Sequence, residues 1–229
     1  MNKKGVARKF DEEAQYYDEY MPKIIDVYLV MIERIIELAR PKNTDTVLDL
    51  GTGTGAISFK LAPKVKKVVA RDISEKMLQV AREKALKNKV KNIDFGYGSF
   101  SEPNCGQKVN LIVSNLAFHH LYDEEKQEAI KVWHNLLKPG GRVILGDVMW
   151  FFDNRKYPEK EEEQFRVIAE WSRSMDSQKS LEEKIEEKKR EDHPANVYDL
   201  KSFFEEEGFI VEGIEEIKSP LMGIICAQK

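Results

Sequence analysis

The chain alternates between short apolar runs with strand character and segments with helical character, and this alternation limits the fold more than any other feature. The strand-like runs occupy residues 47–50, 67–72, 92–98, 109–115 and 142–148. Helical segments lie between several of them; we expect Ser74 and Asp123 to cap two of these helices, and the second to end at the Pro-Gly segment 137–141. Such alternation predicts βαβ units and a parallel, doubly wound sheet.

The last two strands of the predicted sheet must run antiparallel. Residues 199–208 predict a helix ending at Gly208, and residues 209–217 and 221–228 predict two strands. The link between these strands, residues 218–220, is too short for a crossover helix. We therefore expect an α/β fold with a seven-stranded, mostly parallel sheet, a C-terminal antiparallel hairpin and helices on both faces.

The N-terminal residues 1–40 are expected to add helices to a single domain of residues 1–229. Pro22 suits a first helical position, and apolar residues then recur at helical spacing, which predicts one amphipathic helix over residues 22–39. The inward-facing residues expected for it are Ile25, Leu29, Ile32, Ile36 and Ala39.

Residues 150–194 break the alternation and predict a helical insert after the fifth strand. More than half of residues 155–194 are charged, which is typical of solvated helices. Aromatic and aliphatic side chains in its first part, such as Phe165 and Trp171, indicate that the insert docks partly on the domain. Its role stays open between a lid over the site and an interface, and a homodimer is one expectation.

The charge balance and the cysteine content indicate the class of protein. The 37 basic and 40 acidic residues give a formal charge of −3, so nothing points to a nucleic-acid partner. Cys105 and Cys226 predict neither a disulfide framework nor a metal pair. The first 20 residues lack the apolar core of a signal peptide, and no apolar run is long enough to cross a membrane. We expect a cytoplasmic protein.

The stretch TVLDLGTGTGA, residues 46–56, places three glycines directly after the first strand. With Asp72, 21 residues beyond Gly51 at the end of the second strand, it predicts a site for a nucleotide-like ligand whose ribose hydroxyls Asp72 would bind. A G-x-G-x-x-A dinucleotide loop is the alternative. Asp49 in the strand, the long N-terminal segment and the late hairpin all argue against a diphosphate ligand.

Four motifs in order resemble the class I S-adenosylmethionine-dependent methyltransferases. They are VLDLGTGTG, VVARDISEKML, LIVSNLAFHHL and LLKPGGRVIL. The segment NLAFHHLYDEEK is similar to the corresponding segment of small-molecule methyltransferases of quinone biosynthesis and of methionine-to-cysteine recycling. The resemblance implies a Rossmann-like fold, S-adenosylmethionine as cofactor and S-adenosylhomocysteine as its product.

The same resemblance implies roles for residues at the carboxyl ends of the strands. The glycine loop would approach the amino-acid part of the cofactor, Asp49 would lie near its ammonium group, and Asp72 would hold the ribose. Ile73 and Met77 would flank the adenine, and Asn115 and Leu116 would lie beside the methyl group. The expected cofactor-binding set is Tyr17, Asp49, Gly51, Thr52, Gly53, Gly55, Asp72, Ile73, Met77, Ser99, Phe100, Asn115 and Leu116.

Two parts of this set carry open alternatives. Many family members have an acid where this chain has Ser99, and Glu102 is the candidate to substitute for it. Tyr16, Tyr17 and Asp18 resemble the segment that folds over the cofactor, and simple helix-end packing explains them equally well.

His119 and His120 follow the fourth strand at the correct end of the sheet and are the candidate catalytic residues. One of them would serve as a base or contact the acceptor, and the alternative is that both brace their loop. No third ligand is evident near them in the sequence, so we expect no metal. His193 would face the site or end the insert, and Trp150, Tyr157 and Trp171 would line an acceptor pocket or pack.

The favoured function is methyl transfer from S-adenosylmethionine to a small-molecule acceptor. A cofactor-binding or regulatory protein without catalysis is one alternative, and a methyltransferase that modifies tRNA or protein is another. The segment SNLAFHH disfavours amino-methylation of nucleic-acid bases, because no Asn-Pro-Pro-Tyr or Asp-Pro-Pro-Tyr follows the fourth strand.

Overall fold

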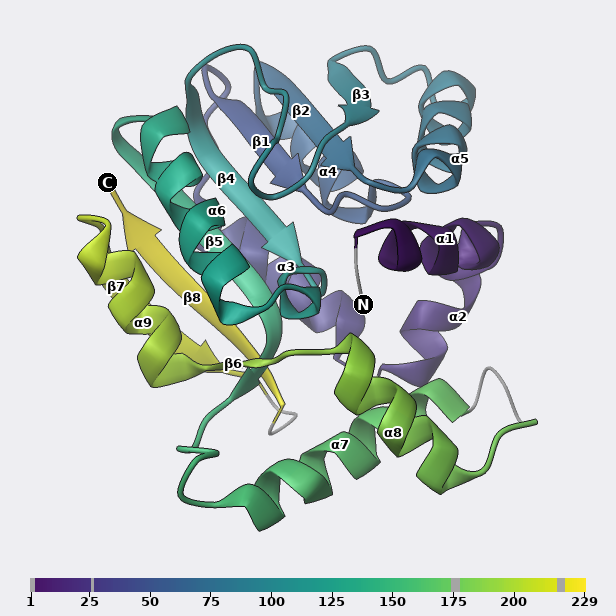
Figure 1. Cartoon of the computed structure of the whole chain (residues 1–229). Helices are drawn as coiled ribbons and strands as arrows, with labels where there is room; N and C mark the ends of the chain where they lie inside the picture. Colours follow the sequence, from purple (N-terminus) through teal and green to yellow (C-terminus); the bar gives the residue numbers. More distant parts are fainter. Residues whose placement is uncertain (1–2, 26, 174–177, 218–220) are drawn as a thin grey trace.

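Seven strands form one sheet in the order β3-β2-β1-β4-β5-β8-β7 in the computed structural model, which describes residues 3–25, 27–173, 178–217 and 221–229 (Figure 1). Strands β1 to β5 run parallel, and β8 pairs antiparallel with both β5 and β7. The predicted fold class is confirmed. The strands are β1 Thr46–Leu50, β2 Lys67–Asp72, β3 Ile93–Tyr97, β4 Val109–Asn115, β5 Leu137–Trp150, β7 Ile210–Glu216 and β8 Met222–Gln228.

A short extra strand, β6 (Ala195–Asn196), pairs in parallel with the end of β5 outside this order. Strand β5 is also longer than predicted and already begins at Leu137, so the Pro-Gly segment that ends the preceding helix is the first part of a strand. The link that we expected between β7 and β8, residues 218–220, lies outside the described residues.

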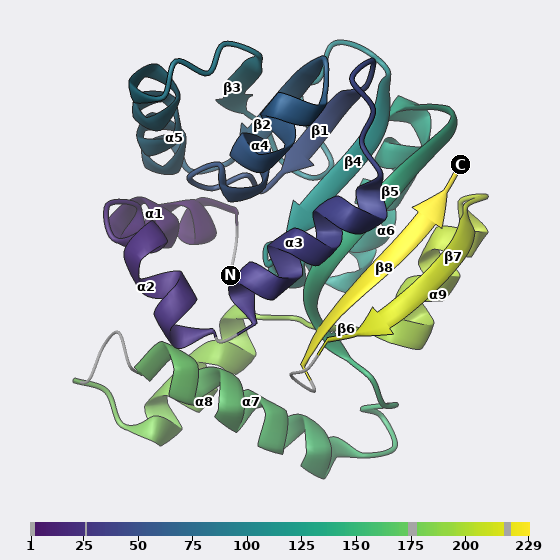
Figure 2. The ribbon, with the colours of Figure 1, turned by 180° about the vertical axis from the view of Figure 1, so that it is seen from behind.

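Helices cover both faces of the sheet, as Figures 1 and 2 show from opposite sides. Helices α3 and α4 pack on one face, and α6 and α9 pack on the other, each pair over its own apolar core. The helices are α1 Lys3–Glu13, α2 Tyr17–Ile24, α3 Tyr28–Ala39, α4 Ala56–Leu61, α5 Glu75–Lys87, α6 Asp123–Leu136, α7 Pro158–Arg173, α8 Leu181–Glu191 and α9 Val197–Glu206, with short 3-10 turns η1 Ala62–Lys64 and η2 Phe118–His120.

The single helix predicted over residues 22–39 is wrong. Pro22 lies inside α2, the backbone is extended at Ile25, and α3 begins at Tyr28. Proline cannot donate the hydrogen bond that would continue the preceding helix, so α2 ends soon after it. Leu29, expected to face inward, is 52% exposed. Tyr28, Met31 and Ile35 are buried, together with the other four residues expected to face inward: Ile25, Ile32, Ile36 and Ala39.

The predicted N-cap residue is confirmed for α5 and is wrong by one position for α6. The Ser74 hydroxyl accepts a hydrogen bond from the Met77 backbone N–H at 3.1 Å and caps α5. Asp123, expected to cap α6, is instead its first residue. The capping position belongs to Tyr122, whose backbone N–H donates to Glu125.

The insert forms α7 and α8, which lie with α1 and α2 beyond the carboxyl ends of the parallel strands (Figures 1 and 2). Phe165, Ile168 and Ala169 of α7 are buried, so the insert docks through an apolar face while its charged face meets solvent. Among the described residues, no helix is both long and apolar enough to span a bilayer. Cys105 and Cys226 are free thiols.

Candidate functional site

The glycine loop after β1 follows a backbone path that only glycine adopts easily. Gly51, Gly53 and Gly55 have φ angles of 67°, 54° and 89°. A side chain at Gly51 would place its Cβ 2.6 Å from the Cβ of Ala117, so this glycine lets the loop lie against the segment after β4. At Gly53 a Cβ would meet no atom within 4 Å, because this residue borders an open pocket.

The loop lies at the edge of a pocket of about 810 Å³, part of which is open to solvent. We call it the glycine-loop pocket. Eleven of the predicted site residues line it: Tyr17, Gly51, Gly53, Asp72, Ile73, Met77, Ser99, Phe100, Asn115, Leu116 and His120. Thr52, Gly55 and Asp49 support the loop from behind and do not line the pocket. The remaining lining residues are Val6, Phe10, Gly98, Ala117, Leu121 and Glu125.

Asp49 is a buried carboxylate that the loop holds through hydroxyl groups. Thr52 and Ser58 donate hydrogen bonds to its Oδ2 at 2.7 and 2.6 Å. Burial raises the pKa of Asp49 to about 6, against the effect of these hydrogen bonds, and the neighbouring Asp72 adds to the rise.

Asp72, at the end of β2, joins the loop to the start of α5. Its carboxylate accepts hydrogen bonds from the backbone N–H of Gly53 at 2.7 Å and of Ser74 at 2.8 Å. Burial raises its pKa, although these N–H groups oppose the rise. A carboxylate has room for about four hydrogen bonds, so Asp72 can still accept two from a ligand in the pocket.

The segment after β4 brings two further predicted residues to the pocket. Asn115 has its side-chain Oδ1 buried without a hydrogen-bond partner among the described residues. Leu116 has a φ of 53°, a left-handed conformation that is unusual for leucine. Unpartnered polar atoms and backbone strain tend to gather at functional sites.

Ser99 does reach the pocket, but Glu102 does not line it. The Ser99 hydroxyl accepts a hydrogen bond from the Glu102 backbone N–H at 3.2 Å, and the Glu102 residue is exposed. The proposed substitution by Glu102 is therefore not supported. Besides Asp72, the pocket is lined by a second acid, Glu125 of α6, which sequence reasoning missed because it lies far along the chain from Ser99.

The N-terminal helices close one side of the pocket. Tyr17 lines it, whereas Tyr16 is 67% exposed. Asp18 accepts hydrogen bonds from the Thr54 hydroxyl of the glycine loop and from Lys84 of α5. Asp11 accepts another from the Ser74 hydroxyl at 2.6 Å. The segment thus folds over the pocket, as the resemblance implied, except that Tyr16 faces away.

A second pocket of about 630 Å³, which we call the histidine pocket, adjoins the first. The two pockets share Phe10, Tyr17, Leu116 and His120. The other lining residues come from α1, α2, the ends of the central strands and the insert: Lys9, Glu13, Tyr20, Met21, Ile25, His119, Val148, Ile168, Trp171, Ser172, Lys188, Asp192 and Met222.

His119 is held by Asp147, a buried residue of β5 that sequence reasoning missed. Its Nδ1 lies 2.5 Å from Asp147 Oδ1, and its backbone N–H donates to Asp147 Oδ2 at 2.9 Å. When the carboxylate accepts a proton from Nδ1 of the neutral imidazole, the lone pair of that ring is on Nε2. An acidic residue inside the apolar strand RVILGDV was the available signal.

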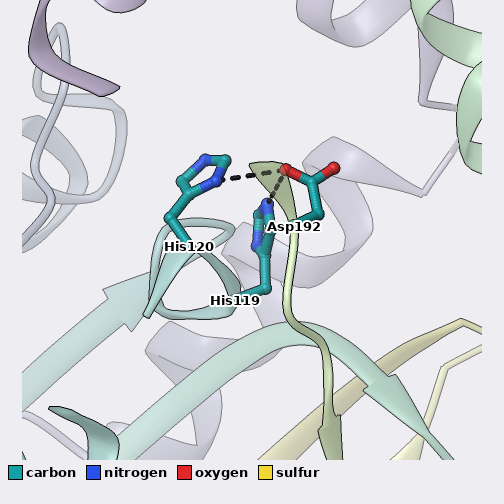
Figure 3. Close-up of side chains that lie close together, drawn as sticks. All are labelled: His119, His120 and Asp192. Carbon is teal, nitrogen blue, oxygen red and sulfur yellow. Dashed lines mark ion pairs between the residues drawn. The ribbon is translucent and has the colours of Figure 1, made fainter. Parts of the chain in front are cut away.

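Both histidines also face Asp192, which follows α8 (Figure 3). His120 Nδ1 lies 3.2 Å and His119 Nε2 3.9 Å from Asp192 Oδ1. The expectation that no third ligand group lies near the histidines is therefore wrong, because these three groups could together hold a metal ion. The charged run around Asp192 gave no signal that this one residue turns inward. Burial lowers the pKa of His120 to about 4, which keeps it neutral near pH 7.

Of the remaining candidate residues, one lines the histidine pocket and the others lie outside it. Trp171 lines the histidine pocket. Trp150 is buried and packs edge-on against Phe165, and Tyr157 is 45% exposed, so neither lines it. His193 stacks on Tyr122 with ring centroids 4.0 Å apart, and its backbone N–H donates to the His119 carbonyl.

The amino-acid sequence matches a known protein family and several relatives. Residues 41–208 match the family described as "Methyltransferase domain". An "uncharacterized methyltransferase" of Geobacillus sp. (strain WCH70) is 37% identical over 141 residues, which are 62% of this chain and 63% of the relative. Another, of Oceanobacillus iheyensis, is 32% identical over 62% of each chain. The chain thus spans less than two thirds of the length of these relatives.

The fold also matches solved structures. Magnesium protoporphyrin IX methyltransferase of Synechocystis PCC 6803, solved with bound SAH, superimposes with a TM-score of 0.71 at 19% identity over 100% of both chains. A putative sarcosine dimethylglycine methyltransferase of Galdieria sulphuraria gives a TM-score of 0.65 at 17% identity, over 89% of this chain and 85% of that one. At such identities the likeness shows the fold alone.

Proposed function

The chain belongs to the S-adenosylmethionine-dependent methyltransferases, and we propose that it transfers the methyl group of this cofactor to a small-molecule acceptor in the histidine pocket. The observation that carries the proposal is the pair of buried carboxylates, Asp49 and Asp72, at the glycine loop. Burial raises the pKa of both. A cationic ligand would stabilise their ionised forms, whereas a diphosphate would be repelled.

The lining of the glycine-loop pocket fits the cofactor group by group. Asp72 can accept hydrogen bonds from a ribose diol. Ile73 and Met77 offer apolar surface to an adenine, next to Ser99. The side-chain Oδ1 of Asn115, which has no hydrogen-bond partner among the described residues, would accept a hydrogen bond from a polar group of the cofactor. Asp49 would act on the cofactor's ammonium group through the loop.

The boundary between the two pockets is where methyl transfer would occur. When bound, the cofactor supplies an activated methyl group on a sulfonium. Leu116 and His120 line both pockets and would align the acceptor with it, and such alignment contributes ~7–11 kcal/mol. His119, held by Asp147, presents the lone pair of Nε2 and could accept a proton from an O–H, N–H or S–H acceptor.

The acceptor is proposed to be small because helices enclose its pocket. Helices α1 and α2 contribute one wall, and the insert contributes Ile168 and Trp171 to another. Apolar and aromatic side chains dominate the lining, and Lys9 and Lys188 add charge at one part of it. This chemistry suits an apolar body with a polar group, rather than a polymer backbone.

The first experiment is calorimetric titration of the purified chain with S-adenosylmethionine, S-adenosylhomocysteine and NAD. We expect binding of the first two and none of NAD. Binding of NAD alone would overturn the assignment of the pocket. A screen of small-molecule acceptors with detection of S-adenosylhomocysteine then tests transfer itself, and cofactor binding without any product from an extract would favour a regulatory protein.

Asp72→Ala tests the ribose contact. The variant loses charge-assisted hydrogen bonds, so we expect cofactor affinity to fall by about 1–3 kcal/mol. Calorimetry measures the change, and circular dichroism checks that the variant is folded. Unchanged affinity in a folded variant would mean that the ribose binds elsewhere. Tyr157→Ala, on an exposed residue outside both pockets, is the matched control.

A further inference from the structure

We propose that His119, His120 and Asp192 form a three-ligand site for a divalent transition-metal ion of the Zn²⁺ type in the wall of the histidine pocket. The site goes beyond the proposed methyl transfer, because metal binding does not depend on the cofactor. Figure 3 shows the two imidazoles and the carboxylate pointing toward one another from η2 and from the segment after α8.

The three ligand atoms lie within 4.8 Å of one another, and two of their three separations are close to those of a tetrahedral ion. Metal–ligand bonds of about 2.0–2.2 Å place tetrahedral ligand atoms about 3.4 Å apart. Asp192 Oδ1 lies 3.2 Å from His120 Nδ1 and 3.9 Å from His119 Nε2, which bracket this value. Three protein ligands with one position left over are typical of catalytic rather than structural zinc sites.

Asp192 presents one carboxylate oxygen to both imidazoles. Its side chain is only 3% exposed, and the contacts of Oδ1 are the two imidazole nitrogens, His120 Nδ1 at 3.2 Å and His119 Nε2 at 3.9 Å. The other oxygen, Oδ2, pairs with Lys188 Nζ at 3.2 Å, so Oδ1 is the atom available to an ion. A cation between this oxygen and the two ring nitrogens would replace these contacts with three metal–ligand bonds.

His119 has the support that metal-binding histidines usually have. Its Nδ1 is bonded to Asp147 Oδ1, which orients the ring and directs the lone pair of Nε2 toward Asp192. His120 presents Nδ1 to the same oxygen. Two imidazoles with one carboxylate favour a borderline transition-metal ion over Mg²⁺, which prefers oxygen ligands.

The surrounding charges are compatible with a divalent ion. Two lysines lie nearby, but Lys9 pairs with Glu191 at 2.7 Å and Lys188 pairs with Asp192. Asp147 and Glu13 bring further negative charge to the same region. Carboxylates therefore outnumber ammonium groups around the site.

The metal site would deepen the proposed function, on which this step rests, by activating the acceptor. An acceptor oxygen or sulfur bound to the ion has a lowered pKa. Its O–H or S–H bond would then break, with the proton passing to water and the electron pair staying on the oxygen or sulfur. That pair would form the new bond to the methyl carbon while the bond from this carbon to the sulfonium sulfur breaks and leaves its electrons on the sulfur of S-adenosylhomocysteine. His119 would in that case be a ligand and not the base.

The test is calorimetric titration of the EDTA-treated full chain with ZnCl₂ and, separately, with MgCl₂. We expect one Zn²⁺ per chain and no comparable Mg²⁺ binding. His119→Ala, His120→Ala and Asp192→Asn should each weaken Zn²⁺ binding by at least about tenfold. His134→Ala, which removes a histidine outside the cluster, is the matched control and should bind Zn²⁺ as the unchanged chain does.

Cofactor titration on the same samples separates the two proposals. His119 and Asp192 do not line the glycine-loop pocket, so binding of S-adenosylmethionine within about twofold of the unchanged chain shows that their variants are folded and that the lost Zn²⁺ affinity reports the site. His120 lines that pocket, so circular dichroism checks the folding of His120→Ala. No Zn²⁺ binding to a chain that binds the cofactor overturns the metal site and leaves methyl transfer standing. Zn²⁺ binding that survives all three substitutions, or equal binding of Mg²⁺, also overturns it. Zn²⁺ binding without cofactor binding would instead count against the proposed function.

Discussion

The carboxylate of Asp49 shows how burial gives one residue opposite effects on stability and on binding. The side chain is 2% exposed, and its pKa is raised from its ordinary 3.8 to about 6. The folded protein therefore holds the Asp49 proton more tightly than the unfolded chain does. A positively charged ligand near the loop would reverse this preference, because it stabilises the ionised form.

The substitution Asp49→Asn tests this effect through the pH dependence of the free energy of unfolding. Between about pH 4 and pH 6 the unfolded chain releases the Asp49 proton while the folded protein keeps it, so the contribution of Asp49 to stability falls as pH rises and levels off above about pH 6. The loss is of order 3 kcal/mol at most, from about two pKa units. Denaturant unfolding across this range should show a steeper decline for the unchanged chain than for the variant.

The same substitution should weaken cofactor binding, because asparagine carries no charge. Higher stability at pH 7 together with lower affinity is the expected pair of results. Parallel stability curves for the two proteins would mean that Asp49 has an ordinary pKa, and unchanged affinity would mean that it does not act on the cofactor.

Residues close together in the sequence were predictable, and residues that approach one another across the fold were not. Gly51 and Gly53 lie in one loop, and Asp72 ends the neighbouring strand, so spacing alone places them at one pocket. Asp147 and Asp192 reach His119 from other elements. Their positions depend on strand order and on how the insert docks, which spacing along the chain does not encode.

At the scale of elements, the insert provides a wall of the histidine pocket and no part of the glycine-loop pocket. Ile168, Trp171 and Ser172 of α7 line the histidine pocket, and none of them lines the glycine-loop pocket. The insert and the N-terminal helices are linked directly, since Lys9 of α1 pairs with Glu191 of α8. The two added segments therefore form walls of the histidine pocket together.

Trp171→Ala tests this division. The substitution removes aromatic surface from the histidine pocket only, so we expect the KM for the acceptor to rise severalfold while the affinity for S-adenosylmethionine stays the same. Steady-state kinetics and calorimetry measure the two quantities. Trp150→Phe, inside the neighbouring core, controls for loosened packing. A matching loss of cofactor affinity would show that the insert also shapes the cofactor pocket.

The strands were more predictable than the helices at their ends. Residues 67–72 and 109–115 form strands with the predicted bounds, because buried parallel strands read as continuous apolar runs. The prediction of one helix over residues 22–39 was wrong because the helical spacing of apolar residues continues through the turn at Ile25. Periodicity shows which side chains are apolar, but it does not show that α2 and α3 pack on different parts of the molecule.

For the whole molecule, the N-terminal helices are the part that ligand binding should stabilise most. Val6, Phe10 and Tyr17 line the glycine-loop pocket, and polar side chains such as Asp11 and Asp18 attach the helices to the domain. A bound ligand would add contacts across this attachment, whereas the central sheet is already buried on both faces.

Hydrogen exchange measures this effect. With saturating S-adenosylmethionine, we expect amides of α1 and α2 to exchange more slowly, and amides of α9, which packs on the sheet away from both pockets, to change little. Equal slowing in all helices would indicate global stabilisation, and no slowing in α1 and α2 would mean that they do not close over the ligand.

The short strand β6 pairs Ala195 and Asn196 with Met149 and Trp150, so the insert leaves the sheet and returns to it at neighbouring, hydrogen-bonded positions. The insert therefore begins and ends at adjacent positions of the sheet. Its length and composition can change between relatives while the register of the sheet stays fixed. Replacement of the insert would therefore change one wall of the histidine pocket and leave in place the strands that carry the glycine loop.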